Sequence, residues 1–222
     1  MAVTVPDQCG SCGKPSTTNC SACKLVKYCD TSCQKKDWAV HKTMCDPELL
    51  AAEARPDPGH RRAILLTENG ERPTFVWISM KEPGFDQFFG SGRLGMVAAR
   101  SIVDAGYGDG KHLDHDISIL HRDEMLVDGK SKKNTLLNKL TKGKMKEFWR
   151  GPVLVHGKAP PLKDCIELWT EDPNRDPCDY YRDLYPCDLG VAVKALARVA
   201  NQQQSVVERF KQTWGEDKVN KD

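Results

Sequence analysis

Eight residues near the start of the chain have the types and the spacing of metal ligands. Seven cysteines and one histidine form four close pairs, which are Cys9/Cys12, Cys20/Cys23, Cys29/Cys33 and His41/Cys45. Ligands of this kind and number fit two closed tetrahedral Zn²⁺ sites, one with four cysteines and one with three cysteines and a histidine. Zinc without an open coordination position is structural and takes no part in catalysis. Because the chain shows no secretory signal, metal binding is favoured over disulfides.

A helix is expected to position two of these pairs. Residues 31–34, Thr-Ser-Cys-Gln, match a capping box, and residues 34–42 contain neither glycine nor proline, so we predict a helix that starts near Thr31. On such a helix Cys33 and His41 would lie about 12 Å apart along the axis, too far for ligands of one metal. The pair that contains Cys33 and the pair that contains His41 should therefore serve different zinc ions. The spacing leaves open which N-terminal pair shares a metal with Cys33.

The segment from Cys9 to Cys45 resembles a MYND zinc finger, with every ligand position matched and with the run YCDTSCQKKDWAVHK at residues 28–42. The resemblance covers about a sixth of the chain and implies two cross-braced sites. One set of implied ligands is Cys9, Cys12, Cys29 and Cys33. The other set is Cys20, Cys23, His41 and Cys45.

The same resemblance implies a partner. MYND fingers bind short proline-rich peptides of a Pro-Pro-Leu kind, which pair with an exposed strand and pack on a Gln and a Trp four residues apart. The matching positions here are Gln34 and Trp38, with residues 24–28 as the strand. A polyproline-type peptide is already extended, so it loses little entropy on docking. A second explanation is that Trp38 covers the small metal core, and both can hold.

The remaining composition is that of an ordinary soluble globular protein. The 222 residues are 39% hydrophobic and 29% charged, with a formal net charge of +2. This balance argues against disorder and against a dominant polyelectrolyte partner. No apolar run approaches the ~20 residues that a membrane span needs. We expect an intracellular protein, nuclear or cytoplasmic, that neither enters a membrane nor binds nucleic acid.

The prolines and glycine of residues 55–59 predict a linker. We therefore divide the chain into a finger (1–46), a linker (47–59), an α+β domain (60–216) and a tail (217–222). Within the α+β domain, β-rich runs at 62–67 and 74–80 flank Asn69-Gly70 and predict a hairpin. Strands are also expected at 116–120 and 152–156, and helices at 93–105 and 134–140. Two further helical stretches are expected near the C-terminus, around Leu189–Ala200 and Val207–Trp214.

Several weaker motifs favour ordinary structural explanations. Residues 90–95 satisfy G-x-G-x-x-G, but no hydrophobic strand precedes them, so we expect a turn into a helix. Residues 111–116, with His121 beyond, contain metal-ligand types, but they lie between a glycine-rich stretch and an expected strand, so a solvated loop is favoured. Basic residues gather at 130–150 and acidic residues at 164–188, and we interpret them as two solvated faces, because the aromatic residues that stack on bases are sparse. Residues 159–162, Ala-Pro-Pro-Leu, form either a loop or a ligand for the chain's own finger.

The function indicated is that of a non-enzymatic adaptor in transcriptional or other regulatory complexes, whose finger binds a proline-rich protein partner. The main alternative is an enzyme of unknown class in residues 60–216 with an accessory finger, which a deep pocket lined by His112 to His121 would mark. A SET methyltransferase is rejected, because its Asn-His-Ser-Cys-x-Pro-Asn-like segment is absent. A third interpretation is that the finger only stabilises or dimerises the rest of the chain.

Overall fold

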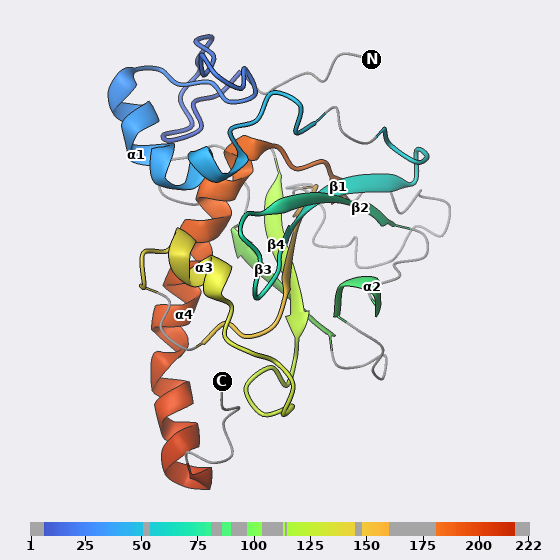
Figure 1. Cartoon of the computed structure of the whole chain (residues 1–222), viewed down its shortest axis with the longest axis vertical. Coiled ribbons are helices and arrows are strands. Elements are labelled where there is room, and N and C mark those ends of the chain that lie inside the picture. The colour runs from blue at the N-terminus through green and yellow to red at the C-terminus, as the bar shows by residue number, and fades with distance from the viewer. Residues whose placement is uncertain are drawn as a thin grey trace, which may run out of the picture.

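The computed structural model describes residues 7–50, 54–80, 86–89, 97–103, 113, 115–144, 148–159 and 181–215. The chain begins with a small finger that contains the helix α1 (Thr31–His41) and a 3-10 turn, η1 (Lys42–Met44). An antiparallel sheet and the long helix α4 (Pro186–Trp214) follow (Figure 1). This arrangement confirms the predicted α+β class with a two-site finger at the N-terminus. The exact domain boundaries stay predictions.

The sheet has six strands in the order β2-β1-β5-β4-β3, and β6 pairs with the end of β5. The strands are β1 (His60–Leu66), β2 (Thr74–Ser79), β3 (Val97–Val103), β4 (Asp116–Arg122), β5 (Val153–Lys158) and β6 (Tyr181–Arg182). The predicted hairpin is confirmed, because Ile64 of β1 lies opposite Phe75 of β2. The central strands β1, β4 and β5 are largely buried, as expected of strands that are covered on both faces.

One face of the sheet packs against α4 and the short helix α3 (Thr135–Leu140) and forms the main hydrophobic core. Trp149 lies fully buried in this core, and its indole N–H donates a 3.0 Å hydrogen bond to the carbonyl of Leu196 in α4. A second, smaller cluster of buried hydrophobic residues includes Phe89, the last residue of the single-turn helix α2 (Asp86–Phe89). The packing of the main core and the hydrogen bond from Trp149 together fix the position of α4.

The finger packs on the N-terminal part of α4, next to α1 (Figure 1). Cys187, in the first turn of α4, belongs to the same buried cluster as the finger residues Cys9, Val26 and Tyr28. Met44, just after α1, belongs to the core of the α+β domain. The two parts of the chain therefore share buried contacts, although each has its own core.

One sequence expectation for secondary structure is wrong, and another is confirmed with a longer helix than expected. The segment expected as a helix at 93–105 contains the strand β3, which pairs along β4 and so gains ladder hydrogen bonds that outweigh its helical pattern. The two helical stretches near the C-terminus are one continuous helix, α4, because the polar residues 201–204 between them contain no glycine or proline. The glycine-rich motif at 90–95, the Pro-Pro-Leu of 160–162 and the tail lie outside the described residues.

Candidate functional site

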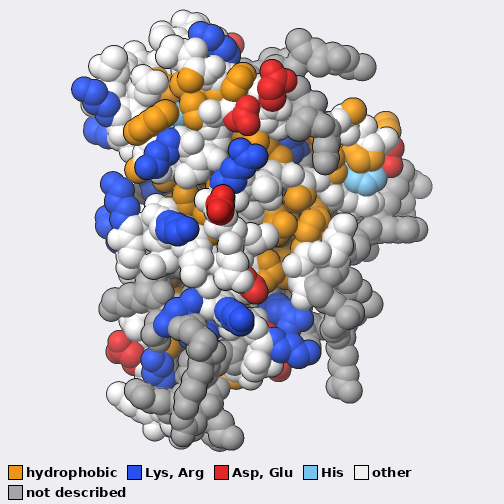
Figure 2. Space-filling model, in the orientation of Figure 1, with side chains coloured by type: hydrophobic (Ala, Val, Ile, Leu, Met, Phe, Trp, Pro, Cys, Tyr) orange, Lys and Arg blue, Asp and Glu red, His pale blue; other side chains and the backbone are white. Residues whose placement is uncertain are grey.

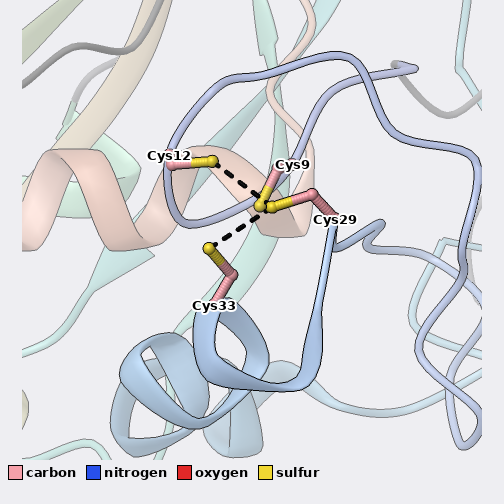
Figure 3. Close-up of side chains that lie close together, drawn as sticks. All are labelled: Cys9, Cys12, Cys29 and Cys33. Atoms are coloured by element: carbon pink, nitrogen blue, oxygen red, sulfur yellow. Dashed lines mark hydrogen bonds between the residues drawn. The ribbon is translucent and has the colours of Figure 1, made fainter.

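Four cysteines from two segments of the finger, residues 9–12 and 29–33, converge to form the first candidate metal site (Figure 3). Cys29 Sγ lies 3.6 Å from Cys12 Sγ and 3.5 Å from Cys33 Sγ. The sulfurs of Cys9, Cys12, Cys29 and Cys33 all lie within 4.8 Å of one another. The pairing that the spacing left open is thereby settled, because the Cys33 pair joins the first N-terminal pair.

The second site contains the three remaining cysteines of the finger and its histidine. Cys20 Sγ lies 3.8 Å from Cys45 Sγ, and Cys23 Sγ lies 3.6 Å from His41 Nε2. These four ligand atoms also lie within 4.8 Å of one another. As predicted, Cys33 and His41 occupy opposite ends of α1 and belong to different sites.

The distances between the ligand atoms fit zinc. In a tetrahedron with Zn–S bonds of about 2.3 Å two sulfurs lie ~3.8 Å apart, and a sulfur and a histidine nitrogen lie ~3.6 Å apart. The observed separations of 3.5 to 3.8 Å agree with both values. Each set offers four donors, so the finger holds two structural Zn²⁺ ions with closed coordination. Among the described residues, no further group of metal-ligating side chains of this kind occurs.

Local sequence features hold α1 in the position that both metals require. The helix begins at Thr31 as predicted, but the capping residue is Asp30, whose Oδ1 accepts a 2.7 Å hydrogen bond from the Cys33 backbone. Aspartate is a strong N-cap, and this contact fixes the first turn that carries Cys33. The α-helix ends at His41 and tightens into the 3-10 turn η1, which brings Cys45 back to the second site.

The protonation preferences of two ligands suit metal binding. Burial lowers the pKa of His41, which favours the neutral imidazole that metals bind. Burial by itself raises the pKa of Cys9. Hydrogen bonds from the backbone of Cys12, Cys29 and Ser11 outweigh that effect and bring the pKa of the Cys9 thiol down to about 7. The first site thus favours a thiolate at Cys9 through its own backbone donors.

The two residues proposed for peptide binding lie beside the second site. Trp38 is 46% exposed, and its ring centroid lies 5.9 Å from that of His41. Gln34 is partly buried, and its side-chain amide lies 3.9 Å from Cys20 Sγ. Trp38 thus contacts the metal core on one side and leaves nearly half of its surface to solvent, so it covers the core, while its role in peptide binding stays a prediction.

The strand candidate at residues 24–28 is already paired within the finger. The carbonyl of Val26 accepts from Cys20 N, and Tyr28 N donates to the carbonyl of Thr18. On the other side, the carbonyl of Lys27 accepts from Gly10 N. Lys27 and Asn19 form a non-hydrogen-bonded antiparallel pair. In such a pair the backbone N–H and C=O of Asn19 point away from Lys27. The N–H and C=O groups of Asn19 are therefore the backbone groups on the outward edge of this pairing.

Sequence analysis missed the contact that fixes the finger on α4. Asp37 Oδ2 accepts a 2.6 Å hydrogen bond from Tyr28 OH, and its Oδ1 lies against Gly190 of α4. Burial, and secondly the carboxylate of Asp37, raise the pKa of Tyr28, so the phenol stays protonated and donates. A glycine within a helical pattern was the only sequence signal for this contact.

Of the histidines in residues 112–121, the structure describes His115 and His121, and these two do not share a site. His112 and Asp114 lie outside the described residues. His115 borders a cavity of about 570 Å³, with Tyr181 and Tyr185 in its wall, and lies 3.7 Å from the carboxylate of Asp188. His121, near the far end of β4, packs against Trp149 at 5.3 Å instead. The two histidines thus have separate surroundings.

Among the described residues, no helix is long and apolar enough to cross a membrane.

Comparisons with known proteins place the finger in a family. The family model "MYND finger" matches residues 9–45, and the residues that follow match no family model. The chain is 28% identical to human Protein CBFA2T2 over 81 residues, which are 36% of this chain and 13% of that protein. It is 46% identical to mouse Tudor domain-containing protein 1 over 71 residues, which are 31% of this chain and 6% of that protein.

A third relative, mouse Protein CBFA2T2, is 37% identical over 43 residues, which are 19% of this chain and 7% of that protein. The chain thus matches only a small part of each of these relatives. No solved structure matches the chain. Residues 9–45 are a MYND finger, a zinc-binding module for protein interaction with two structural metal sites.

Proposed function

We propose that the chain is a non-catalytic adaptor in regulatory complexes, and that its finger binds a short proline-rich peptide of a partner protein through Gln34 and Trp38. The observation that carries this proposal is the exposure of Trp38. An indole that is 46% exposed on a rigid helix offers a flat apolar surface, on which proline rings pack well.

The surroundings of Trp38 support this assignment. Gln34 and Trp38 stand one turn apart on the same face of α1, so an amide and an aromatic ring are presented side by side. Two zinc ligands contact these side chains: the ring of His41 lies next to Trp38, and the sulfur of Cys20 lies next to the amide of Gln34. Because the site is preorganised, little conformational entropy is lost when a peptide docks.

The backbone partner of the peptide is assigned to a different segment than the sequence suggested. Residues 26–28 pair on both sides, whereas the peptide groups of Asn19 face outward. Gln34 lies close to Cys20, the next residue after Asn19. We therefore place the extended peptide along residues 18–20, with its prolines on Trp38.

Fluorescence polarisation of a labelled Pro-Pro-Leu peptide panel on the zinc-loaded protein tests this proposal. We expect saturable binding in roughly the micromolar range, which Trp38→Ala abolishes. Val127→Ala is the matched control, because among the described residues Val127 is the other strongly exposed large hydrophobic side chain, at 40%, and it lies in the α+β domain. Equal binding by wild type and Trp38→Ala would overturn the assignment.

A further inference from the structure

A groove of about 690 Å³ runs along the junction between the finger, the end of α3 and the middle of α4. Neither part of the chain forms it alone. The finger contributes one turn of α1, and the α+β domain contributes the loop after α3 together with α4. The groove therefore exists only while the folded finger is docked on α4.

Among the described residues, the charged side chains that line the groove are all cationic. They are Lys36, Lys142, Lys144, Lys194 and Arg198. All five side chains are exposed, and no described aspartate or glutamate is among the lining residues. Within the described part of the chain none of the five forms an ion pair. Arg198 donates a hydrogen bond to the backbone carbonyl of Ile102. In a chain with a net charge of only +2, this is a local excess of positive charge.

The floor between these cations is apolar. Ala39 and Val40 of the finger line the groove together with Leu140 and Val193 of the α+β domain. In Figure 2, blue side chains are interleaved with orange ones over α1, α3 and the upper part of α4, along the left edge of the view. Cations at the rim and aliphatic side chains on the floor together suit a ligand that carries both carboxylates and aliphatic groups.

We propose that this groove binds an acidic segment of a partner protein in which carboxylates alternate with aliphatic side chains. The carboxylates pair with the lysines of the rim, and the aliphatic side chains cover the floor. The lining residues that the structure describes include no aromatic side chain, so they offer no stacking platform of the kind that single-stranded nucleic acids use. Charge complementarity and the aliphatic floor therefore favour a peptide.

The acidic-peptide groove is independent of the face proposed for proline-rich peptides. Lys36 and Trp38 are two residues apart on α1, which places them about 200° apart around the helix axis. The two ligands thus approach opposite faces of α1. A partner with both kinds of segment, or two different partners, can bind at the same time.

The test uses the zinc-loaded chain of 222 residues and a fluorescein-labelled peptide of alternating Glu and Leu residues, and polarisation reports binding. A peptide of alternating Glu and Ser residues controls for charge alone. In the double variant Lys36→Glu/Lys194→Glu we expect the affinity for the Glu-Leu peptide to fall by about tenfold or more. Lys35→Glu is the matched control, because Lys35 is an exposed neighbour on α1 that does not line the groove. It should change the affinity by less than about twofold.

Zinc content and circular dichroism check that each variant is folded. Absence of binding by the wild type, an equal loss in Lys35→Glu, or equal affinity for the Glu-Ser peptide would overturn the proposal. Tighter binding of a short single-stranded DNA with the same variant pattern would make the groove a nucleic-acid site instead.

The chain's own acidic segment is tested in the same assay. Residues 164–179 contain six carboxylates, and a variant with all six replaced by amides removes this charge. If the Glu-Leu peptide binds only this variant, the occupant is the chain itself and the partner proposal is wrong. Trp38→Ala should leave acidic-peptide binding unchanged, so the two proposals can fail separately.

Discussion

Asp37 of the finger lies directly against Gly190 of α4, and a methyl group at position 190 would come within 2.7 Å of Asp37 Oδ1. Asp37 has little freedom to move away, because Tyr28 OH donates a 2.6 Å hydrogen bond to its other carboxylate oxygen. The finger and the helix therefore approach each other closely at a residue without a side chain. This contact connects the zinc-dependent fold of the finger with the core of the α+β domain.

Gly190→Ala should destabilise the protein. In an unobstructed helix this change would be stabilising by about 1 kcal/mol. Here the clash with Asp37 should reverse the sign and lower the free energy of unfolding by about 1–3 kcal/mol. Urea denaturation in the presence of zinc measures the effect. In an Asp37→Ala background the same Gly190→Ala change should become neutral or stabilising, and a stabilising effect in the wild-type background would show that the contact is loose.

Removal of zinc should affect α4 as well as the finger. Structural zinc contributes on the order of 10 kcal/mol to the folding of such modules, so a chelator should unfold residues 9–45. Because Cys187 packs in the buried cluster of the finger, we expect the first turns of α4 to lose protection from hydrogen exchange. The central strands β4 and β5 should keep theirs. Loss of protection confined to the finger would contradict a shared interface.

Two buried cysteines of the same hydrophobic cluster should respond differently to substitution. Cys33 is a zinc ligand, whereas Cys187 belongs to the same buried cluster but to neither ligand set. Cys33→Ser should therefore release zinc and unfold the finger. Cys187→Ser should keep both ions and cost only about 1 kcal/mol. Metal analysis of the purified variants decides, and retention of two zinc ions by Cys33→Ser would contradict the assigned ligand set.

His156 should make the α+β domain sensitive to mild acid. Burial, and secondly the positive charge of Lys158, lower the pKa of His156 to about 4, and in the described part of the structure neither ring nitrogen has a hydrogen-bond partner. An unfolded histidine takes up a proton below pH ~6.5. Between pH ~6.5 and about 4 the unfolded chain thus binds more protons, so the free energy of unfolding falls as the pH falls.

The contribution of His156 to this acid sensitivity is on the order of 3 kcal/mol. His156→Leu removes the titrating group and should flatten the dependence in that window. Urea midpoints of wild type and variant, measured from pH 7 to pH 4.5, give the comparison. If the urea midpoints of the two proteins fall in parallel with pH, His156 is not the source of the acid sensitivity. Release of zinc in acid should affect both proteins equally, so it does not change the difference between them.

The metal sites were predictable because their chemistry is local. Eight ligands lie within residues 9–45, and the rigid spacing of Cys33 and His41 on one helix is enough to separate the two metals. The capping residue of α1 was harder to predict, because two neighbouring polar residues can both cap the helix. Asp30 rather than Thr31 takes that position. Both residue types serve as N-caps, and the capping-box pattern pointed to Thr31 although aspartate is the stronger cap.

The long-range features could not be predicted in the same way. The strand β3 exists because β4 offers a partner edge, which local propensity does not record. Asp37 and Gly190 are far apart in the sequence, and no pattern links them. The groove between α1 and α4 depends on that contact, so its lysines looked like separate solvated residues in the sequence.

The central claim is that the Gln34–Trp38 face of the finger binds a proline-rich peptide. The most direct test is a titration of the zinc-loaded, ¹⁵N-labelled protein with a Pro-Pro-Leu peptide, followed by two-dimensional NMR. We predict saturable shifts of the Trp38 indole N–H, the Gln34 side-chain amide and the backbone amides of residues 18–20, with the signals of the α+β domain unchanged. Shifts confined to the α+β domain, or none at saturating peptide, would contradict the account.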